Sequence, residues 1–432
     1  MKIGSTHVLF QSFSSIGPFL DFVALFPVMV IFGGDALPEI TALSFIISFL
    51  TLIPVLFFTG LSHTNEGYAS YASLAFGRRM GMLTGFIYIA YSVLVLPNII
   101  MFLSSFIFPL TTIPTGFKPY FYLGFSLLYL SILWLPLSRG LTWSIRPIVI
   151  LGMIEITSII ALSIFMIYDS PRILTYPPFP TFFTGNFWDG VIIGILMFSG
   201  GGSGIFLQRD AERNIASIRK PLVTSYLVTG STMTLASFGI TYFLGNSMSQ
   251  FGLDPDILFE NLGAVGGFSV IIFFTILLFI SGFNLTLSYG NALLQMSHDF
   301  LRRITKAVPS RFNLSFILLI LASVVLVISY YTVGFYLSFL LIADLVSMLY
   351  VTVHIITGTS LIRTDPKGKH GIIGVLSVII LIFSITASLD GSYGDQDFLT
   401  ALFLIVVSIS IFLSVLMYNP DKAQSENMEP AQ

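Results

Sequence analysis

The chain has 432 residues, of which 9% are charged and 55% hydrophobic, with 43 phenylalanines. Soluble domains carry roughly 25% charged residues, so this composition excludes an ordinary soluble protein and favours one solvated by a lipid bilayer. The lack of cysteine excludes disulfides, thiolate zinc sites and cysteine nucleophiles. A net charge of −2 excludes a broadly basic nucleic-acid surface.

Stretches of about 20 mostly apolar residues are long enough to cross the hydrocarbon of a bilayer. The sequence predicts twelve such spans, at residues 12–33, 40–60, 80–108, 120–137, 145–168, 189–207, 221–245, 266–297, 312–331, 335–357, 371–388 and 398–418. We therefore expect one all-α polytopic transmembrane domain over residues 1–418. A polar cytoplasmic tail is expected at residues 419–432.

Basic residues predict the orientation of these spans. With twelve spans and a cytoplasmic N-terminus, 17 of the 19 lysines and arginines fall in cytoplasmic segments, and Lys118 and Arg172 fall outside. This is the bias that the positive-inside rule describes. One missed or added span would exchange the sides of all later loops and remove the bias. We therefore expect a multi-pass protein of the cell membrane with both termini in the cytoplasm.

Two predicted spans contain residues that an uninterrupted helix avoids. In the first, Pro18 lacks an amide donor and disfavours helical backbone at Gly17. In the sixth, four glycines stand within residues 200–204, and each costs about 1 kcal/mol relative to alanine inside a helix. Paired interruptions of this kind indicate the central binding site of a transporter. Close helix packing is the alternative explanation of the glycine run.

Three acidic residues fall within predicted spans, namely Asp21, Glu155 and Asp344. A carboxylate in a membrane span is costly and usually faces the interior of the helix bundle. We expect Asp21, which adjoins the first interruption, and Glu155 to bind a proton or a coupling cation. A counter-ion role for a substrate amine and a purely structural hydrogen bond are the alternatives.

Polar residues also gather on one face of the eighth span, where Asn284 and Ser288 are candidate substrate contacts. The five histidines lie mostly near span ends and show no spacing typical of a metal site. We therefore expect neither a metal nor a cofactor. Paired catalytic residues at helical spacing are not seen within the spans, so an enzyme is not expected.

The order and spacing of four short sequence stretches along the predicted spans are informative. The stretches are Ile16-Gly17-Pro18, residues 65–71 (Asn-Glu-Gly-Tyr-Ala-Ser-Tyr), residues 212–221 (Glu-Arg-Asn-Ile-Ala-Ser-Ile-Arg-Lys-Pro) and Lys369-His370. Together they resemble motifs of the amino acid–polyamine–organocation superfamily of permeases, and the likeness covers most of residues 10–390. The third stretch is the most specific, although Ala216 stands where the family has its first proline.

The resemblance implies a leucine-transporter-like fold with discontinuous helices one and six. It contains a 5+5 inverted repeat, over residues 12–168 and 189–357, and extra helices at residues 371–418. Amides after the first interruption would hold a substrate carboxylate, and carbonyls at both interruptions would hold its amine. The implied substrate-binding residues are Ile16, Gly17, Pro18, Phe19, Leu20, Asp21, Phe22, Phe198, Ser199, Gly200, Gly201, Gly202, Ser203 and Gly204.

This sequence departs from the family pattern at both of its central acids. Leu20-Asp21-Phe22 replaces a Gly-Ser-Gly that many relatives carry, and Glu155 stands where some relatives have a lysine. The expected function is secondary transport of an amino acid or amine by alternating access, coupled to H⁺. Sodium coupling and exchange of another small organic solute are alternatives. A channel is the less favoured class, because no repeated filter sequence is visible.

Overall fold

The computed structural model describes residues 3–107, 117–170, 185–211, 215–305, 309–391 and 396–418. The predicted tail at residues 419–432 and residues 212–214 of the third motif lie outside these ranges. Within them the chain is helical, and its one β-type contact is an isolated bridge between Ile3 and Ala211. The all-α class predicted from the sequence is confirmed.

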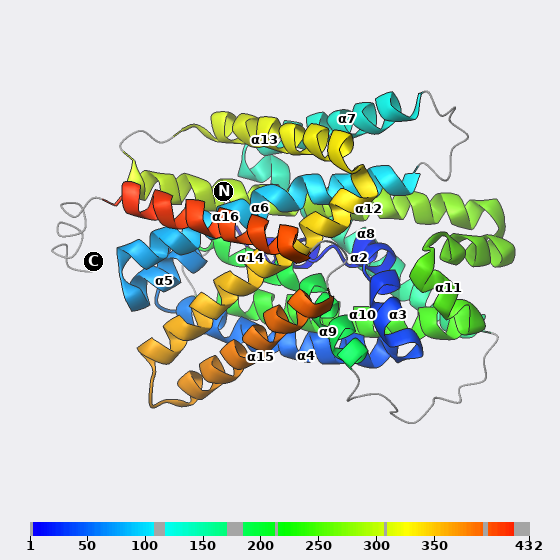
Figure 1. Cartoon of the computed structure of the whole chain (residues 1–432), viewed down its shortest axis with the longest axis horizontal. Coiled ribbons are helices and arrows are strands. Elements are labelled where there is room, and N and C mark those ends of the chain that lie inside the picture. Colours follow the sequence, from blue (N-terminus) through cyan, green and yellow to red (C-terminus); the bar gives the residue numbers. More distant parts are fainter. Residues whose placement is uncertain are drawn as a thin grey trace.

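Long helices form a bundle (Figure 1). They are α4 (Leu37–Phe58), α6 (Arg78–Ile107), α7 (Lys118–Arg139), α8 (Leu141–Tyr168), α10 (Ala216–Leu244), α12 (Asp256–Ile304), α13 (Arg311–Thr332), α14 (Phe335–Thr364), α15 (Lys369–Gly391) and α16 (Gln396–Leu416). Of these, α14 and α15 run obliquely to the long axis of the molecule (Figure 1). The backbone of α12 leaves helical geometry at Gly267, where φ is 66°.

Shorter helices and 3₁₀ segments fill the middle and the ends of the bundle. They are α1 (Ser5–Ser14), α2 (Pro18–Ala24), α3 (Phe26–Gly33), η1 (Gly34–Ala36), α5 (Tyr68–Phe76), α9 (Gly185–Met197), η2 (Ser199–Leu207), η3 (Gly245–Ser247) and α11 (Met248–Leu253). Helix α1 packs against η2, α8 and α10, while α12 packs against α2, α6, α8 and η2. The short segments α1, α2 and η2 are therefore enclosed by long helices.

Ten helical segments of the described chain are long and apolar enough to cross a membrane. The protein is thus a multi-span membrane protein, as its composition predicts. The predicted first span is divided among α1, α2 and α3, and the predicted eleventh overlaps a shorter apolar segment over Lys369–Phe383. The count of twelve spans and the inverted repeat stay predictions.

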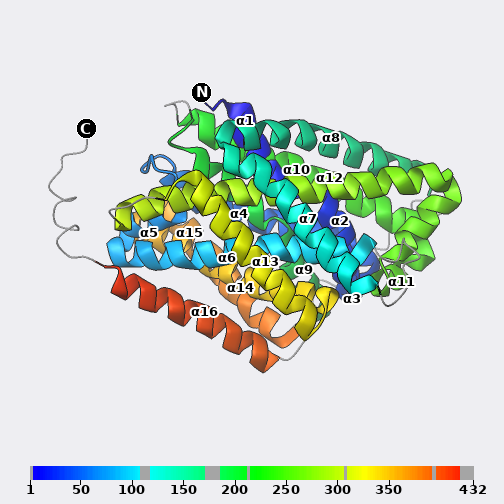
Figure 2. The same ribbon diagram turned by 90° about the horizontal axis from the view of Figure 1, so that it is seen from above.

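The outer surface of the bundle is apolar. Helices α7 and α13 lie side by side, and α16 runs along the outside next to α6 (Figures 1 and 2). Exposed large side chains on α13 include Ile317, Ile320, Val324 and Ile328. A contiguous apolar exterior of this kind is unfavourable in water and is solvated by lipid.

Candidate functional site

The first interruption lies at Gly17, between α1 and α2. Its φ of 65° and ψ of 53° are left-handed, a conformation that glycine adopts without the strain of a side chain. A Cβ at this position would also stand 2.6 Å from Cδ2 of Leu285. Pro18 then begins α2, where its missing amide costs no helical hydrogen bond. Glycine and proline therefore end one helix and start the next at buried depth.

The second interruption is the 3₁₀ segment η2, which is longer than the three or four residues usual for this conformation. Its glycines also allow close packing. A Cβ on Gly200 would overlap the carbonyl of Ser15, one on Gly201 would meet the Tyr226 ring, and one on Gly202 would meet the Tyr68 hydroxyl. Helix interruption and close packing were alternatives for this run, and the structure contains both.

Hydroxyl groups join the two interruptions to α12. The Ser203 hydroxyl lies 3.0 Å from the Gln11 carbonyl and 2.6 Å from Oγ of Ser15. Ser288 donates to the same carbonyl at 2.7 Å, and its Oγ lies 2.5 Å from that of Ser15. These contacts satisfy the carbonyl end of α1 and bring four oxygens together. Ser288 therefore has a hydrogen-bonding role between helices.

A cavity of about 70 Å³ lies between the two interruptions. The first interruption contributes Ile16, Leu20 and Asp21 to its wall, and the second contributes Ser199. Gly17, Pro18, Phe19, Phe22, Phe198 and residues 200–204 do not line it. The structure thus brings both predicted segments to one cavity, although four of the predicted residues face it and the others pack around it.

Asp21 is the one acidic residue in the described cavity wall. Its side chain is 7% exposed, and no described residue forms an ion pair or a hydrogen bond with its carboxylate. An ionised carboxylate that is buried without a partner is strongly unfavourable. This group therefore requires a proton or a cationic ligand within the cavity.

Glu155 lies outside the cavity wall and is fully buried. Its Oε1 accepts hydrogen bonds from the Phe19 amide at 3.0 Å and from the Ser281 hydroxyl at 2.5 Å. Its Oε2 lies 3.4 Å from Nδ2 of Asn284, and that amide also donates to Ser14 at 2.7 Å. Ser281 in turn accepts from the Leu20 amide at 2.9 Å. The first free amides of α2 are thus bonded within the protein.

Other wall residues were not anticipated from the sequence. They include Asn98 on α6, Tyr289 on α12 and Phe339 on α14. The hydroxyl of Tyr289 lies 2.7 Å from that of Tyr91, which in turn lies 3.3 Å from Oγ of Ser199.

A sequence signal was available for one further unanticipated residue, Ser281. It continues the polar face of Asn284 and Ser288 by one helical turn. The wall residues Asn98 and Phe339 carry no comparable pattern, because each stands in a largely apolar stretch typical of any span.

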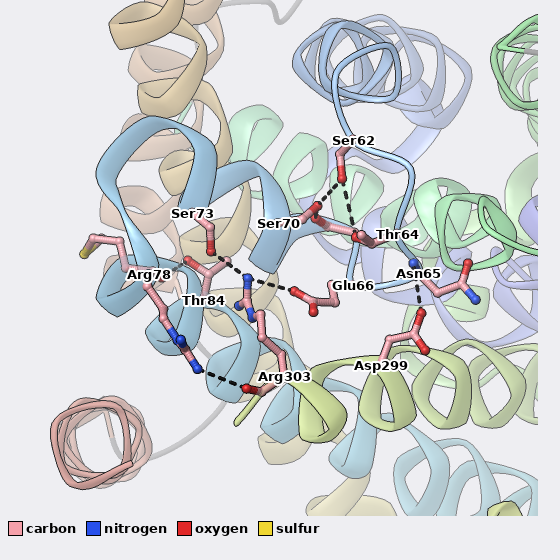
Figure 3. A network of polar contacts seen from close by, with 12 residues as sticks. Ser62, Thr64, Asn65, Glu66, Ser70, Ser73, Arg78, Thr84, Asp299 and Arg303 are labelled. Carbon is pink, nitrogen blue, oxygen red and sulfur yellow. Dashed lines mark hydrogen bonds and ion pairs between the residues drawn. The ribbon is translucent and has the colours of Figure 1, made fainter. Parts of the chain in front are cut away.

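A polar network lies at one end of the bundle, and we define it as Asn65, Glu66, Arg209, Asp210, Asp299 and Arg303. Arg209 pairs with Asp299 at 2.5 Å, and Arg303 pairs with Glu66 at 3.0 Å. Nδ2 of Asn65 donates to Asp210 at 2.8 Å. Figure 3 shows how Asn65 and Glu66, in the segment between α4 and α5, face Asp299 and Arg303 at the end of α12. Arg209 and Asp210 follow η2, so the network also holds the second interruption.

Among the described residues, no group of three or more histidine, aspartate or glutamate side chains is placed to hold a metal ion. The arrangement offers a small cavity whose wall contains a buried carboxylate and residues from both interruptions. Comparison of the chain with protein-family models and with curated proteins finds no match to either.

Proposed function

We propose that this protein is a secondary transporter that carries an amino acid or a related amine across the membrane by alternating access. The observation that carries the proposal is the cavity between the two interruptions, with Asp21 in its wall. Ligand sites at discontinuous helices are the general arrangement of carriers with midplane binding sites. The order of the permease-like motifs, which places these interruptions in spans one and six, supports the same function.

Alternating access requires that each end of the bundle can open in turn. The polar network ties the segments that follow α4 and η2 to α12, so its ion pairs must separate before the cavity opens at that end. Movement of α1, α2 and η2 against α12 would accomplish this. With both termini in the cytoplasm, as the basic residues predict, the network forms the inner closure.

Coupling to H⁺ is assigned to Asp21 or Glu155, the two buried carboxylates next to the first interruption. Sodium is the alternative coupling ion, and one observation favours it. The Gln11 carbonyl and the hydroxyls of Ser15, Ser203 and Ser288 form a cluster of oxygens, which are the ligands that hard cations prefer.

The test is counterflow in liposomes that contain the purified protein. Vesicles are loaded with unlabelled amino acids or amines, and entry of the labelled compound is followed under an imposed proton or sodium gradient. We expect saturable entry that is accelerated by internal substrate and driven by a proton gradient. Acceleration by sodium alone would move the coupling assignment to the oxygen cluster. Non-saturable flux without counterflow would overturn the carrier and indicate a channel.

A further inference from the structure

The amides at the start of α2 are already occupied. The resemblance assigns them to a substrate carboxylate, yet the Phe19 amide donates to Glu155 and the Leu20 amide donates to Ser281. Glu155 is fully buried, and its Oε1 also accepts from Ser281. A second carboxylate at this position would have to displace these bonds and lie beside the first, where the two charges repel. The chain therefore supplies its own carboxylate here.

The cavity wall also lacks a partner for an anion. Among the described wall residues there is no lysine, arginine or histidine, and the one ionisable carboxylate is Asp21. Its carboxylate has no ion pair within the described chain. A zwitterion would bring an anionic group that finds no cation here. An ammonium group alone would neutralise Asp21 and leave no charge unpaired.

Aromatic side chains complete a surface suited to a cation. Tyr289 and Phe339 line the cavity with Asp21, and the faces of such rings attract ammonium groups. The volume of about 70 Å³ sets the size of the occupant. Each water needs roughly 10–15 Å³ measured in this way, so the cavity has room for a short, slender molecule.

We propose that Glu155 determines specificity by occupying the Phe19 amide, so that the cavity takes a small primary monoamine without a carboxylate, held by Asp21. This inference rests on the proposed carrier function and narrows its substrate class. Glu155 lies outside the cavity wall and excludes a carboxylate by occupying the Phe19 amide, so it acts on specificity without contacting the ligand. Asp21 contacts the ligand itself.

The experiment compares amino acids with the amines left when their carboxylate is removed. Matched pairs are alanine with ethylamine, valine with isobutylamine, and leucine with isopentylamine, each offered as labelled substrate to the same proteoliposomes. We expect counterflow of at least one amine, with its amino acid weaker by about tenfold or more, the factor for losing one hydrogen bond to a charged group. Equal or better counterflow of the amino acids would overturn the inference and leave the carrier standing. Counterflow of no compound would overturn both.

Variants separate the roles of the two carboxylates. Asp21→Asn should raise the KM for the amine by about tenfold or more, whereas Glu260→Gln, which removes an exposed carboxylate on α12, should leave it unchanged. Glu155→Ala should shift preference toward the amino acid of each pair, because the Phe19 amide becomes free. An unchanged preference in a Glu155→Ala protein that folds would overturn its specificity role. If that variant does not fold, the comparison of amino acids with their amines on the wild-type protein tests the inference.

Discussion

The carboxylate of Glu155 on α8 accepts a hydrogen bond from the amide of Phe19 on α2, at 3.0 Å. The two residues are 136 positions apart in the sequence. A helix start leaves its first amides without partners inside the helix, and in a lipid-solvated protein no water replaces them. Glu155 and Ser281 supply acceptors for the amides that the interruption at Gly17 exposes. This contact therefore allows the chain to leave and re-enter helix inside the bundle.

Removal of the Glu155 carboxylate should destabilise the protein. In Glu155→Ala the buried Phe19 amide loses its partner, which costs about 1–3 kcal/mol. Glu155→Gln keeps an acceptor oxygen and should unfold at a temperature near that of the wild type. Thermal unfolding of the purified protein in detergent measures the difference. Equal unfolding temperatures for the two variants would show that α2 does not depend on this acceptor.

Gly17→Ala should impair both stability and transport. The left-handed backbone costs about 1–2 kcal/mol with a side chain present, and the new Cβ would stand 2.6 Å from Cδ2 of Leu285. Gly124→Ala on α7 is the matched control, since no heavy atom other than those of its chain neighbours and its own helix backbone lies within 4 Å of its added Cβ. Counterflow and thermal unfolding measure the effects. A Gly17→Ala protein as active and stable as the control would contradict the strained interruption.

Glycines of η2 should differ in their tolerance of alanine. At Gly200 the added Cβ would overlap the backbone carbonyl of Ser15, whereas at Gly202 it would meet the hydroxyl end of the Tyr68 side chain, which can move. We therefore expect Gly200→Ala to lose counterflow and Gly202→Ala to retain more of it. Surface expression and gel-filtration profiles check that both variants insert and fold. The reverse order of activity would contradict the close approach of α1 and η2.

Weakening the polar network should expose the cavity. The chain has no cysteine, so Ser199→Cys introduces a single thiol in the cavity wall. Asp299→Asn removes the charge that pairs with Arg209. Charged thiol reagents should label Ser199→Cys several-fold faster in the Asp299→Asn background. Ser237→Cys, buried on α10, is the control and should stay unlabelled in both backgrounds. Unchanged labelling of Ser199→Cys would exclude the network as a closure.

The positions of the helix interruptions are more predictable from the sequence than the contacts that each side chain makes. Gly17-Pro18 predicts a local departure from helix because both residues act on their own backbone, and the structure departs from helix there. The same reasoning treated Asn284 and Ser288 as candidate ligand contacts, whereas the structure gives both hydrogen bonds to other helices. Polarity on a helix face indicates that the face is buried, and it does not distinguish a ligand from a neighbouring helix.

Composition and the length of the apolar stretches together predicted an all-helical protein of the membrane, because a chain with 9% charged residues cannot form a water-exposed surface and stretches of about 20 apolar residues cross a bilayer as helices. Only the tertiary structure decided which groups meet at the interruptions. Glu155 reaches the Phe19 amide and Asp21 faces a cavity with Tyr289 and Phe339 because α2, α8, α12 and α14 pack around one another. Hydrogen bonds and cavities depend on distances between segments far apart in the sequence, and packing sets those distances.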